Sequence, residues 1–453
     1  MEDQPNSGRR VLVVGLGVSG AAAVRHLQRA GAEVLASDDD AGDRPRAVAA
    51  ELGVELLCAP DPDTLAGLAP SLDEIVVSPG VPASHPVFTL DGPPVIGEVE
   101  LAWRRARVPV VAVTGTNGKT TVVTLVAAML ESSGLRAVAA GNIGLPLVEA
   151  VESDAEILVV EVSSFQLALT DRFRPAVSGW LNFSDDHLDW HGSLDHYRSA
   201  KARIWANAGP GDVVVANVED PVVVAAAAAP TSAGARLVGF GIDAGDWRLD
   251  DGNLLGPGGE VLARCDELRR SRPHDVVDAL CAAALARAAG ATAEGTRAAL
   301  LAFGGLPHRV ELVGEARGVR YFDDSKATTP GAVLAAVSGF DSAVLIAGGR
   351  NKGLDLGILR VAAPRLRGVV AIGEAAAEIR AAFEGACPVE EAATMDEAVR
   401  RASTMASSGD AVLLSPACAS FDWYGNYAER GRDFRRAVEL LEGAAPAAGP
   451  EAP

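Results

Sequence analysis

Cysteine is scarce in this chain, and its five residues are scattered, with no CxxC pair and no even disulfide framework. Cys58, Cys265, Cys281, Cys387 and Cys418 are therefore typical of a reducing compartment, and we expect a cytoplasmic protein. No run of 18 or more apolar residues is present, which argues against a membrane-spanning helix. The polar opening MEDQPNSGRR is not followed by the apolar stretch of a signal peptide.

Positive charge is also in short supply. The 40 Lys and Arg residues stand against 60 Asp and Glu, which gives a formal net charge of −20. Because no Lys/Arg cluster interrupts this acidic background, neither nucleic acid nor an anionic membrane is expected as a partner. An acidic protein that handles nucleotides must gather positive charge locally, from backbone amides, helix N-termini, single basic side chains and divalent metal.

The composition otherwise fits a compact α/β protein, with 49% hydrophobic and 22% charged residues. Its 453 residues suggest about three domains at roughly 150 residues each. Strand–loop–helix patterns begin again near residues 107 and 307, and the last part contains the strand-like runs SAVLIAGG and DAVLLSPA. We therefore predict a Rossmann-like domain (1–106), a P-loop domain (107–306) and a doubly wound domain (307–453), with a disordered tail AAPAAGPEAP.

The first glycine motif contains Gly15, Gly17 and Gly20 between a predicted strand and a predicted helix, with Asp38 ending the next strand. Small residues let the chain turn tightly and approach a phosphate, and an acid there can bind sugar hydroxyls or a base edge. The pattern predicts a nucleotide or pyrophosphate site, against the alternative of a structural turn. NAD and a UDP-sugar fit it equally, so an NAD-dependent oxidoreductase is one hypothesis.

The second glycine motif, GTNGKTT at residues 115–121, lies between a predicted buried strand and a long predicted helix. Backbone amides of such a loop cradle phosphate, Lys119 supplies a charge, and the Thr120 or Thr121 hydroxyl can hold Mg²⁺. Val113 occupies the place of the first glycine in the usual P-loop pattern. The order of Gly, Lys and Thr after a strand nevertheless favours a nucleoside triphosphate site over a structural turn.

Further polar groups follow predicted strands. Glu161 ends the strand-like EILVVE, where a carboxylate beside a P-loop strand commonly holds Mg²⁺. His187 stands among three aspartates, which favours metal binding or proton transfer over a structural histidine. Lys201, by its spacing alone, cannot be distinguished from a surface lysine.

In the last third of the chain, polar loops occur at 308–309, 323–328, 348–352 and 415–432. Cys418, in the last of them, has no matched His and acid in its vicinity, so a nucleophilic role is disfavoured.

The motifs taken in order resemble the Mur ligase family over residues 10–435. They are GTNGKTT, GNIGLP (141–146), EVSSFQL, NFSDDHLDWHG, LPHRVE, DDSKATTP and SPACASFDWYGNYAERG. GTNGKT alone would also admit folylpolyglutamate synthase, whereas DSKAT with SPACASFD is characteristic of the members that add D-glutamate. The resemblance implies a monomeric, ATP-dependent amide-bond-forming ligase of peptidoglycan precursor synthesis. Its substrates would be UDP-N-acetylmuramoyl-L-alanine and D-glutamate, joined through an acyl-phosphate. The alternatives are a related ligase that uses L-glutamate or another amino acid, and a non-catalytic nucleotide sensor.

The resemblance also implies a role for each polar loop. The ATP site would comprise Gly115, Thr116, Asn117, Gly118, Lys119, Thr120, Thr121, Asp275, Arg309 and Asp324. The UDP-linked substrate would contact Gly15, Gly17, Val18, Ser19, Asp38, Asn142, Ser163 and Gln166. Glutamate would contact Thr328, Lys352, Ser420, Phe421 and Tyr427. Two Mg²⁺ ions would be held by Thr120, Glu161, His187 and Lys201, the lysine being carbamylated in the family. Lys119, Glu161, His187 and Lys201 would be the catalytic residues.

Two positions depart from the family pattern. Asp275 and Asp278 stand where the family has asparagines near the base and ribose of ATP. We therefore expect these two aspartates to affect the affinity for the adenine or the ribose of ATP more than any other property that the resemblance implies.

Overall fold

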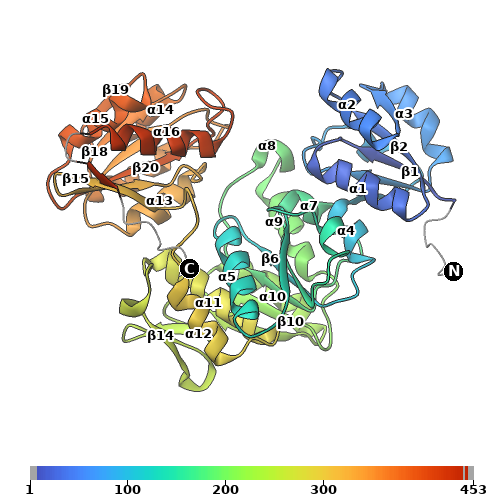
Figure 1. The fold of residues 1–453 in the computed structure, drawn as a ribbon, viewed down its shortest axis with the longest axis horizontal. Coiled ribbons are helices and arrows are strands. Elements are labelled where there is room, and N and C mark those ends of the chain that lie inside the picture. The colour runs from blue at the N-terminus through green and yellow to red at the C-terminus, as the bar shows by residue number, and fades with distance from the viewer. Residues whose placement is uncertain (1–7, 442–443, 447–453) are drawn as a thin grey trace. The chain divides into compact units, whose positions relative to one another are not determined.

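The computed structural model describes residues 8–441 and 444–446. Contacts divide the chain into two compact units, each built mainly from parallel strands and helices (Figure 1). The first unit comprises Met1–Phe183, Trp190–Glu267 and Val277–Leu301, and the second comprises Ser184–Asp189, Leu268–Val276 and Ala302–Pro453. The predicted α/β class is confirmed. Among the described residues, no helix combines the length and the hydropathy that crossing a bilayer requires.

A five-stranded parallel sheet, in the order β3-β2-β1-β4-β5, opens the first unit. Its strands are β1 (Arg10–Val14), β2 (Glu33–Asp38), β3 (Glu55–Cys58), β4 (Glu74–Val77) and β5 (Val95–Gly97). Its helices are α1 (Val18–Arg29), α2 (Asp43–Leu52) and α3 (Pro62–Leu68). At Gly20 a Cβ atom would lie 1.8 Å from the carbonyl oxygen of Gly15. Only glycine therefore lets α1 approach the preceding turn so closely.

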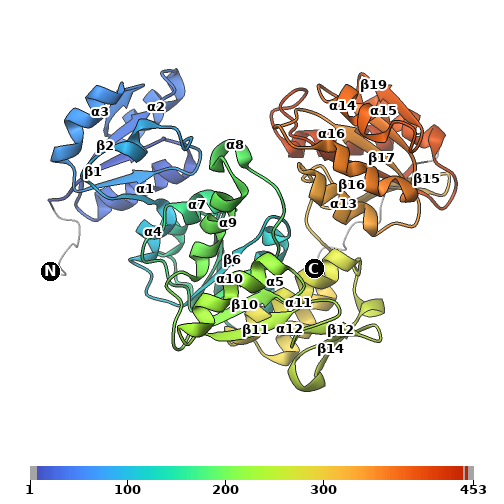
Figure 2. The ribbon, with the colours of Figure 1, turned by 180° about the vertical axis from the view of Figure 1, so that it is seen from behind.

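A second sheet of six parallel strands, in the order β11-β10-β9-β6-β8-β7, forms the centre of the same unit. Its strands are β6 (Val110–Thr114), β7 (Ala137–Gly141), β8 (Ile157–Glu161), β9 (Val177–Trp180), β10 (Val213–Asn217) and β11 (Arg236–Phe240). Every residue of β6 and β8 is buried, as expected of strands covered on both faces. Figure 2 shows α5 and α10 beside β6 and β10.

The helices that follow these strands have the bounds α5 (Lys119–Glu131), α6 (Leu147–Ala150), α7 (Ser164–Ala168), α8 (Leu188–His191), α9 (Leu194–Ala202), α10 (Pro221–Ser232), α11 (Pro273–Ala288) and α12 (Ala293–Ala302). A small antiparallel sheet contains β12 (Arg248–Asp250), β13 (Asn253–Leu255) and β14 (Val261–Arg264).

The second unit contains a seven-stranded sheet in the order β19-β18-β17-β20-β16-β15-β21. Its strands are β15 (Glu311–Ala316), β16 (Val319–Asp323), β17 (Ala343–Gly348), β18 (Leu366–Ile372), β19 (Val389–Ala392), β20 (Ala411–Ala417) and β21 (Ala444–Pro446). Its helices are α13 (Pro330–Ser338), α14 (Ala376–Phe383), α15 (Met395–Met405) and α16 (Tyr427–Glu439). The strands expected at SAVLIAGG and DAVLLSPA are β17 and β20.

The tail prediction is wrong for its first three residues. β21 pairs antiparallel with β15, so 444–446 are an ordered edge strand, whereas the rest of AAPAAGPEAP lies outside the described residues. Backbone pairing needs no apolar period, and for that reason the composition did not reveal the strand.

A short helix, α4 (Glu98–Trp103), follows the first sheet and carries a buried carboxylate at Glu100. The Glu100 carboxylate accepts hydrogen bonds from the backbone N–H groups of Asp171, Arg172 and Phe173 at 2.9–3.1 Å. It also accepts one from the guanidinium of Arg104 at 2.9 Å. Glu100 therefore fastens α4 to the loop that precedes β9.

The Glu100→Ala substitution is expected to lower the stability of the first unit by about 3 kcal/mol, because it leaves buried amides and an arginine without their acceptor. The measurement is the melting temperature, which should fall by about 2–4 °C for each kcal/mol in a domain of this size. Glu33→Ala is the matched control, because the side chain of Glu33 is 66% exposed and its pair with Arg10 contributes little. Equal melting temperatures for the two variants would contradict this account of Glu100.

Candidate active site

The loop of residues 115–118 joins β6 to α5 and is held in shape by an asparagine from another strand. Asn182, which follows β9, accepts hydrogen bonds at its Oδ1 from Thr116 N (3.0 Å) and Asn117 N (2.9 Å). Its Nδ2 donates to the carbonyl oxygen of Asn117 at 3.2 Å. The side chain of Asn182 thus fixes both sides of the loop in advance of any ligand. No separate role was predicted for Asn182 from the sequence.

Gly118 ends this loop and is the N-cap of α5, with a φ of 84°. A Cβ atom at Gly118 would lie 2.4 Å from Oδ1 of Asp278 on α11. Both the positive φ and the close carboxylate therefore require glycine at this position. The same distance places Asp278, one of the two departures from the family pattern, directly beside the phosphate-binding loop.

Two lysines converge on the first residue of the loop. Lys119 Nζ donates to the carbonyl oxygens of Gly115 (2.8 Å) and Thr116 (3.0 Å). Lys201 Nζ also donates to Gly115 O, at 2.7 Å, and lies 4.7 Å from the centre of the Tyr197 ring. Lys201 is only 1% exposed, so it is not a surface lysine, and the chain gathers positive charge locally as an acidic nucleotide-binding protein must.

Glu161 ends β8, as expected, and connects the loop to a neighbouring segment. It is buried, and its Oε2 accepts a hydrogen bond from Thr120 Oγ1 at 2.8 Å. Its Oε1 accepts one from Asn142 Nδ2 at 2.7 Å. The hydroxyl and the carboxylate are oxygen donors of the kind that Mg²⁺ prefers, so Thr120 and Glu161 fit a divalent cation beside the loop.

His187 lies in the segment Ser184–Asp189, which belongs to the second unit. Its Nε2 is 3.3 Å from Oδ2 of Asp186, and its backbone N–H donates to Oδ1 of the same side chain. The structure therefore brings Lys119, Thr120, Glu161 and Lys201 together in the first unit. His187 belongs to the second unit.

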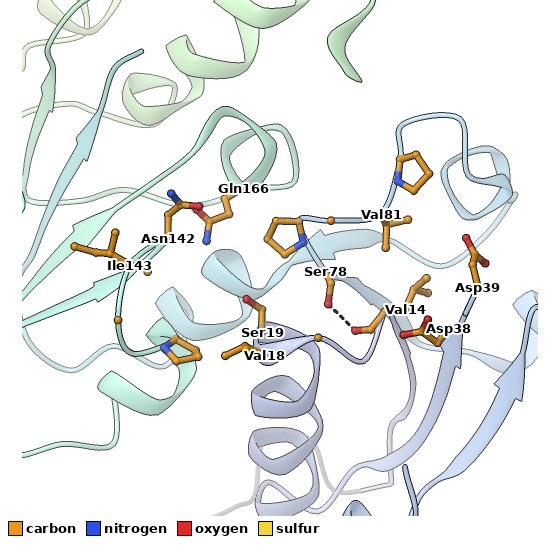
Figure 3. Close-up of a pocket in the computed structure, with 18 residues that line it drawn as sticks. Val14, Val18, Ser19, Asp38, Asp39, Ser78, Val81, Asn142, Ile143 and Gln166 are labelled. Carbon is orange, nitrogen blue, oxygen red and sulfur yellow. Dashed lines mark hydrogen bonds between the residues drawn. The ribbon is translucent and has the colours of Figure 1, made fainter. Parts of the chain in front are cut away.

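The first unit also contains a cavity of roughly 650 Å³ (Figure 3). Val14 lines it from β1, Ser19 from the first turn of α1 and Ser78 from the loop after β4. Asn142 and Gln166 line it from segments that follow β7 and β8. Its residues are Val14, Gly15, Gly17, Val18, Ser19, Asp38, Asp39, Ser78, Pro79, Gly80, Val81, Pro82, Gly141, Asn142, Ile143, Gly144, Pro146 and Gln166. All the residues expected to contact a UDP-linked substrate are in this set except Ser163.

Several lining residues also shape the cavity wall. Asp38 Oδ2 accepts a hydrogen bond from Leu16 N at 2.7 Å, and Ser78 Oγ donates to Gly15 O at 2.6 Å, so both support the glycine turn. Ser163 caps α7 in a reciprocal pair with Gln166, which accounts for its place behind the wall rather than in it. No role was predicted from the sequence for the loop 78–82, which also lines the cavity.

In the second unit, a buried arginine connects the polar loops. Arg430 donates to Ser325 Oγ and Ser325 O at 2.9 Å, and to Cys418 O at 3.1 Å. A backbone pair between Arg350 and Ala419 adds the loop 348–352. The loops that carry Thr328, Lys352, Ser420, Phe421 and Tyr427 are thereby held together. Phe421 is 58% exposed.

Asp324 and Cys418 are buried in this cluster. Burial raises the pKa of the Asp324 carboxyl to about 7, against the hydrogen bond from Ser415 Oγ and the charge of Arg309, which lower it. Burial likewise raises the pKa of the Cys418 thiol to about 12. A thiol with so high a pKa is not a nucleophile at neutral pH, which agrees with the sequence-based interpretation.

These features define a P-loop α/β enzyme that carries a second binding cavity. Protein-family models match at residues 9–91 (Mur ligase MurD-like, N-terminal domain), 113–257 (Mur ligase middle domain) and 308–418 (Mur ligase, glutamate ligase domain). The chain belongs to the Mur ligase family, as the motif resemblance predicted, and it is an ATP-dependent amide-bond-forming ligase with the three-domain architecture of that family.

Curated relatives match over nearly the whole chain. The UDP-N-acetylmuramoylalanine–D-glutamate ligase of Frankia casuarinae is 44% identical and covers 96% of this chain and 95% of its own. The enzyme of the same name from Thermobifida fusca is 41% identical and covers 96% and 99%.

Solved structures share the fold at lower identity. MurF from Acinetobacter baumannii has a TM-score of 0.62 at 19% identity and covers 96% of this chain and 92% of its own. The UDP-N-acetylmuramate–alanine ligase MurC from Thermotoga maritima has a TM-score of 0.59 at 21% identity and covers 95% and 99%.

Lys119→Ala is expected to lower kcat for ligation by about 10²–10³-fold, because it removes a charge that the loop places where phosphate charge develops. The measurement is steady-state phosphate release. Arg136→Ala, which removes a cation that is 62% exposed on the same unit, is the control and should turn over like the unaltered protein. Normal turnover by Lys119→Ala would refute the assignment of the loop.

Proposed function

We propose that this protein adds D-glutamate to UDP-N-acetylmuramoyl-L-alanine in peptidoglycan precursor synthesis, with ATP as the energy source and an acyl-phosphate as the intermediate. The curated relatives of that name, at 44% and 41% identity over nearly full length, support the substrates. One geometric observation supports the chemistry. Asn142 lines the cavity and is hydrogen-bonded to Glu161, which is hydrogen-bonded to Thr120 of the phosphate loop. The cavity and the phosphate loop are therefore two hydrogen bonds apart.

The reaction brings anions together in its first step. A carboxylate oxygen of the acceptor attacks the γ-phosphorus of ATP, the bond to the β-phosphate oxygen breaks, and ADP leaves. Loop amides at 115–121 and the ammonium group of Lys119 neutralise the developing charge. In the second step the glutamate amine attacks the acyl carbon, inorganic phosphate leaves, and the amine loses a proton as the amide forms.

Magnesium would be held by the Thr120 hydroxyl and the Glu161 carboxylate, because both groups offer the oxygen ligands that this ion prefers and they already lie within hydrogen-bond distance of each other. When bound, it supplies charge neutralisation to the phosphate oxygens. We further propose that Lys201 is carbamylated, because this would convert the buried ammonium beside Gly115 into an anionic oxygen ligand for a second ion. The proposed role of His187 rests on the sequence motif alone.

The nucleotide assignment extends to Arg309, Asp324 and Asp275 in the second unit. Asp275 is paired with Arg270 at 2.9 Å, and Arg270 also donates to the carbonyl oxygen of Arg309 at 2.7 Å. The negative charge that replaces the family asparagine at Asp275 is thus compensated within the chain. This supports retention of nucleotide binding despite the departure.

The domain boundaries at 1–106, 107–306 and 307–453, a monomeric state and a cytoplasmic location are part of the same proposal. The NAD-dependent oxidoreductase hypothesis gives no function to the phosphate loop, Glu161 and Lys201. Membership of the Mur ligase family also argues against it. A non-catalytic nucleotide sensor would bind ATP without turnover.

The test of the proposed function is phosphate release by the purified protein with ATP, Mg²⁺, UDP-N-acetylmuramoyl-L-alanine and a panel of amino acids. We expect release that depends on both the acceptor and D-glutamate. Release with L-glutamate in place of D-glutamate would select the related-ligase alternative, and no release with any pair would leave the sensor hypothesis.

Lys352→Ala is expected to raise the KM for glutamate by about tenfold or more, because an exposed ammonium beside the loop of Ser420 is the proposed partner of a glutamate carboxylate. The KM values for ATP and for the acceptor should stay within about twofold of those of the unaltered protein. Arg380→Ala, which removes a cation that is 62% exposed on the same unit, is the control. An unchanged KM for glutamate in Lys352→Ala would make the assignment wrong.

A further inference from the structure

Helix α6 lies directly after the loop 141–146, whose residues form one wall of the cavity. Asn142 is in this loop, so its position depends on α6 as well as on its hydrogen bonds to Glu161. The helix has only four residues, and its own backbone hydrogen bonds are too few to keep it in place. Its position must therefore come from neighbouring elements.

Helix α1 holds α6 and the turn that follows it through two arginine ion pairs and one hydrogen bond of His26. Arg25 contacts Glu149 at 2.8 Å, and Glu152 contacts His26 at 3.0 Å and Arg29 at 2.7 Å. The first turn of α1 carries Val18 and Ser19, which line the opposite wall of the cavity. These contacts therefore join the two walls through the helices behind them.

Helix α4 holds α6 from another side through a single buried carboxyl. Glu98 is 1% exposed, and its Oε1 accepts a hydrogen bond from Val148 N in the first turn of α6 at 2.7 Å. Its Oε2 is also buried and has no hydrogen-bond partner among the described residues. A carboxyl left half-satisfied in the interior costs stability, so a purely structural need would be met better by an apolar side chain.

We propose that Glu98 is a positioning residue for the UDP-substrate cavity, which holds α6 and thereby sets the loop of Asn142 against the first turn of α1. The inference rests on the proposed function, because it takes this cavity as the site of the UDP-linked substrate. Glu98 lines no part of the cavity and acts only through Val148 and the loop before it.

The protonation of Glu98 is linked to this contact. Burial raises its pKa from 4.5 to about 7, the amides of Val148 and Leu147 lower it, and the charge of Glu149 raises it. Arg25, on α1, offsets part of the charge of Glu149. A carboxylate accepts a hydrogen bond more strongly than a neutral acid, so the hold on α6 weakens as the pH falls through 7.

The free energy of unfolding depends on pH in the opposite direction to the strength of the Glu98 hydrogen bond. The pKa of Glu98 is higher in the folded protein than in the unfolded chain. Protonation of Glu98 therefore contributes most to the free energy of unfolding below pH 4.5, and this contribution is lost as the pH rises to about 7. Positioning and stability thus have opposite pH dependences, which separates the proposed role from a merely structural one.

The experiment compares Glu98→Ala, Glu98→Gln and the matched control Glu100→Ala, which alters the neighbouring buried carboxyl of the same helix. In Glu98→Ala the KM for UDP-N-acetylmuramoyl-L-alanine should rise about five- to tenfold, the size of one lost helix-cap hydrogen bond, with the KM for ATP and glutamate within about twofold. Glu100→Ala should melt earlier, with the KM for the acceptor unchanged.

Glu98→Gln keeps an oxygen acceptor but cannot ionise. Between pH 8 and pH 6 the unaltered protein should lose affinity for the acceptor relative to Glu98→Gln, and it should gain stability relative to that variant. A parallel pH dependence of acceptor KM in the two proteins would overturn the proposal, as would an equal rise in all three KM values for Glu98→Ala. If Glu98→Ala does not fold, the Glu98→Gln comparison alone decides.

Direct titration of the UDP-linked acceptor onto the unaltered protein distinguishes a wrong proposed function from a wrong role for Glu98. If the unaltered protein does not bind the UDP-linked acceptor, the proposed function is wrong. If it binds, and Glu98→Ala binds with the same affinity, only the role of Glu98 is wrong.

Discussion

The convergence of two lysine side chains on one backbone carbonyl is the interaction on which the proposed chemistry depends. A protein with a net charge of −20 repels its own anionic substrates over most of its surface. Lys119 places a positive charge at Gly115, and an unmodified Lys201 adds a second one, within a shell formed by buried strands. Because Lys201 is almost fully buried, its charge is little screened by solvent. The proposed carbamylation would replace this cation with an anion, and the bound metal ions would then supply the positive charge that attracts phosphate.

Order in the phosphate loop comes from outside the loop. Asn182 makes three hydrogen bonds to it, and the Asp278 carboxylate lies so close to Gly118 that only glycine fits at position 118. The loop is therefore preorganised by Asn182, a residue 65 positions beyond Asn117 along the chain. Preorganisation of this kind reduces the reorganisation that binding requires, which is the usual source of electrostatic catalysis.

The parts of the fold and site that could be predicted from sequence are those encoded locally. The buried strand before GTNGKTT, the acid at the end of β8 and the glycines after β1 each have a signature within a few residues, and the structure places them as expected. Lys201 was assigned only through the family resemblance, and no separate role was predicted for Asn182 or for the loop 78–82, because their roles depend on which strands become neighbours in the sheet. β6 pairs with β8 and β9, and no local pattern states that order. The ordered strand β21 was missed for the same reason, since backbone pairing leaves little trace in composition.

Strand β21 has three residues and replaces the longer β15 as the outermost strand of the sheet. It covers the outer edge of β15, whose amides and carbonyls would otherwise be available to a strand from another chain. A version of the protein shortened before residue 444 would expose that edge, and with it a template for intermolecular β-pairing. The residue at which a recombinant chain ends therefore affects its solubility, although residues 444–446 lie far along the sequence from any proposed catalytic residue.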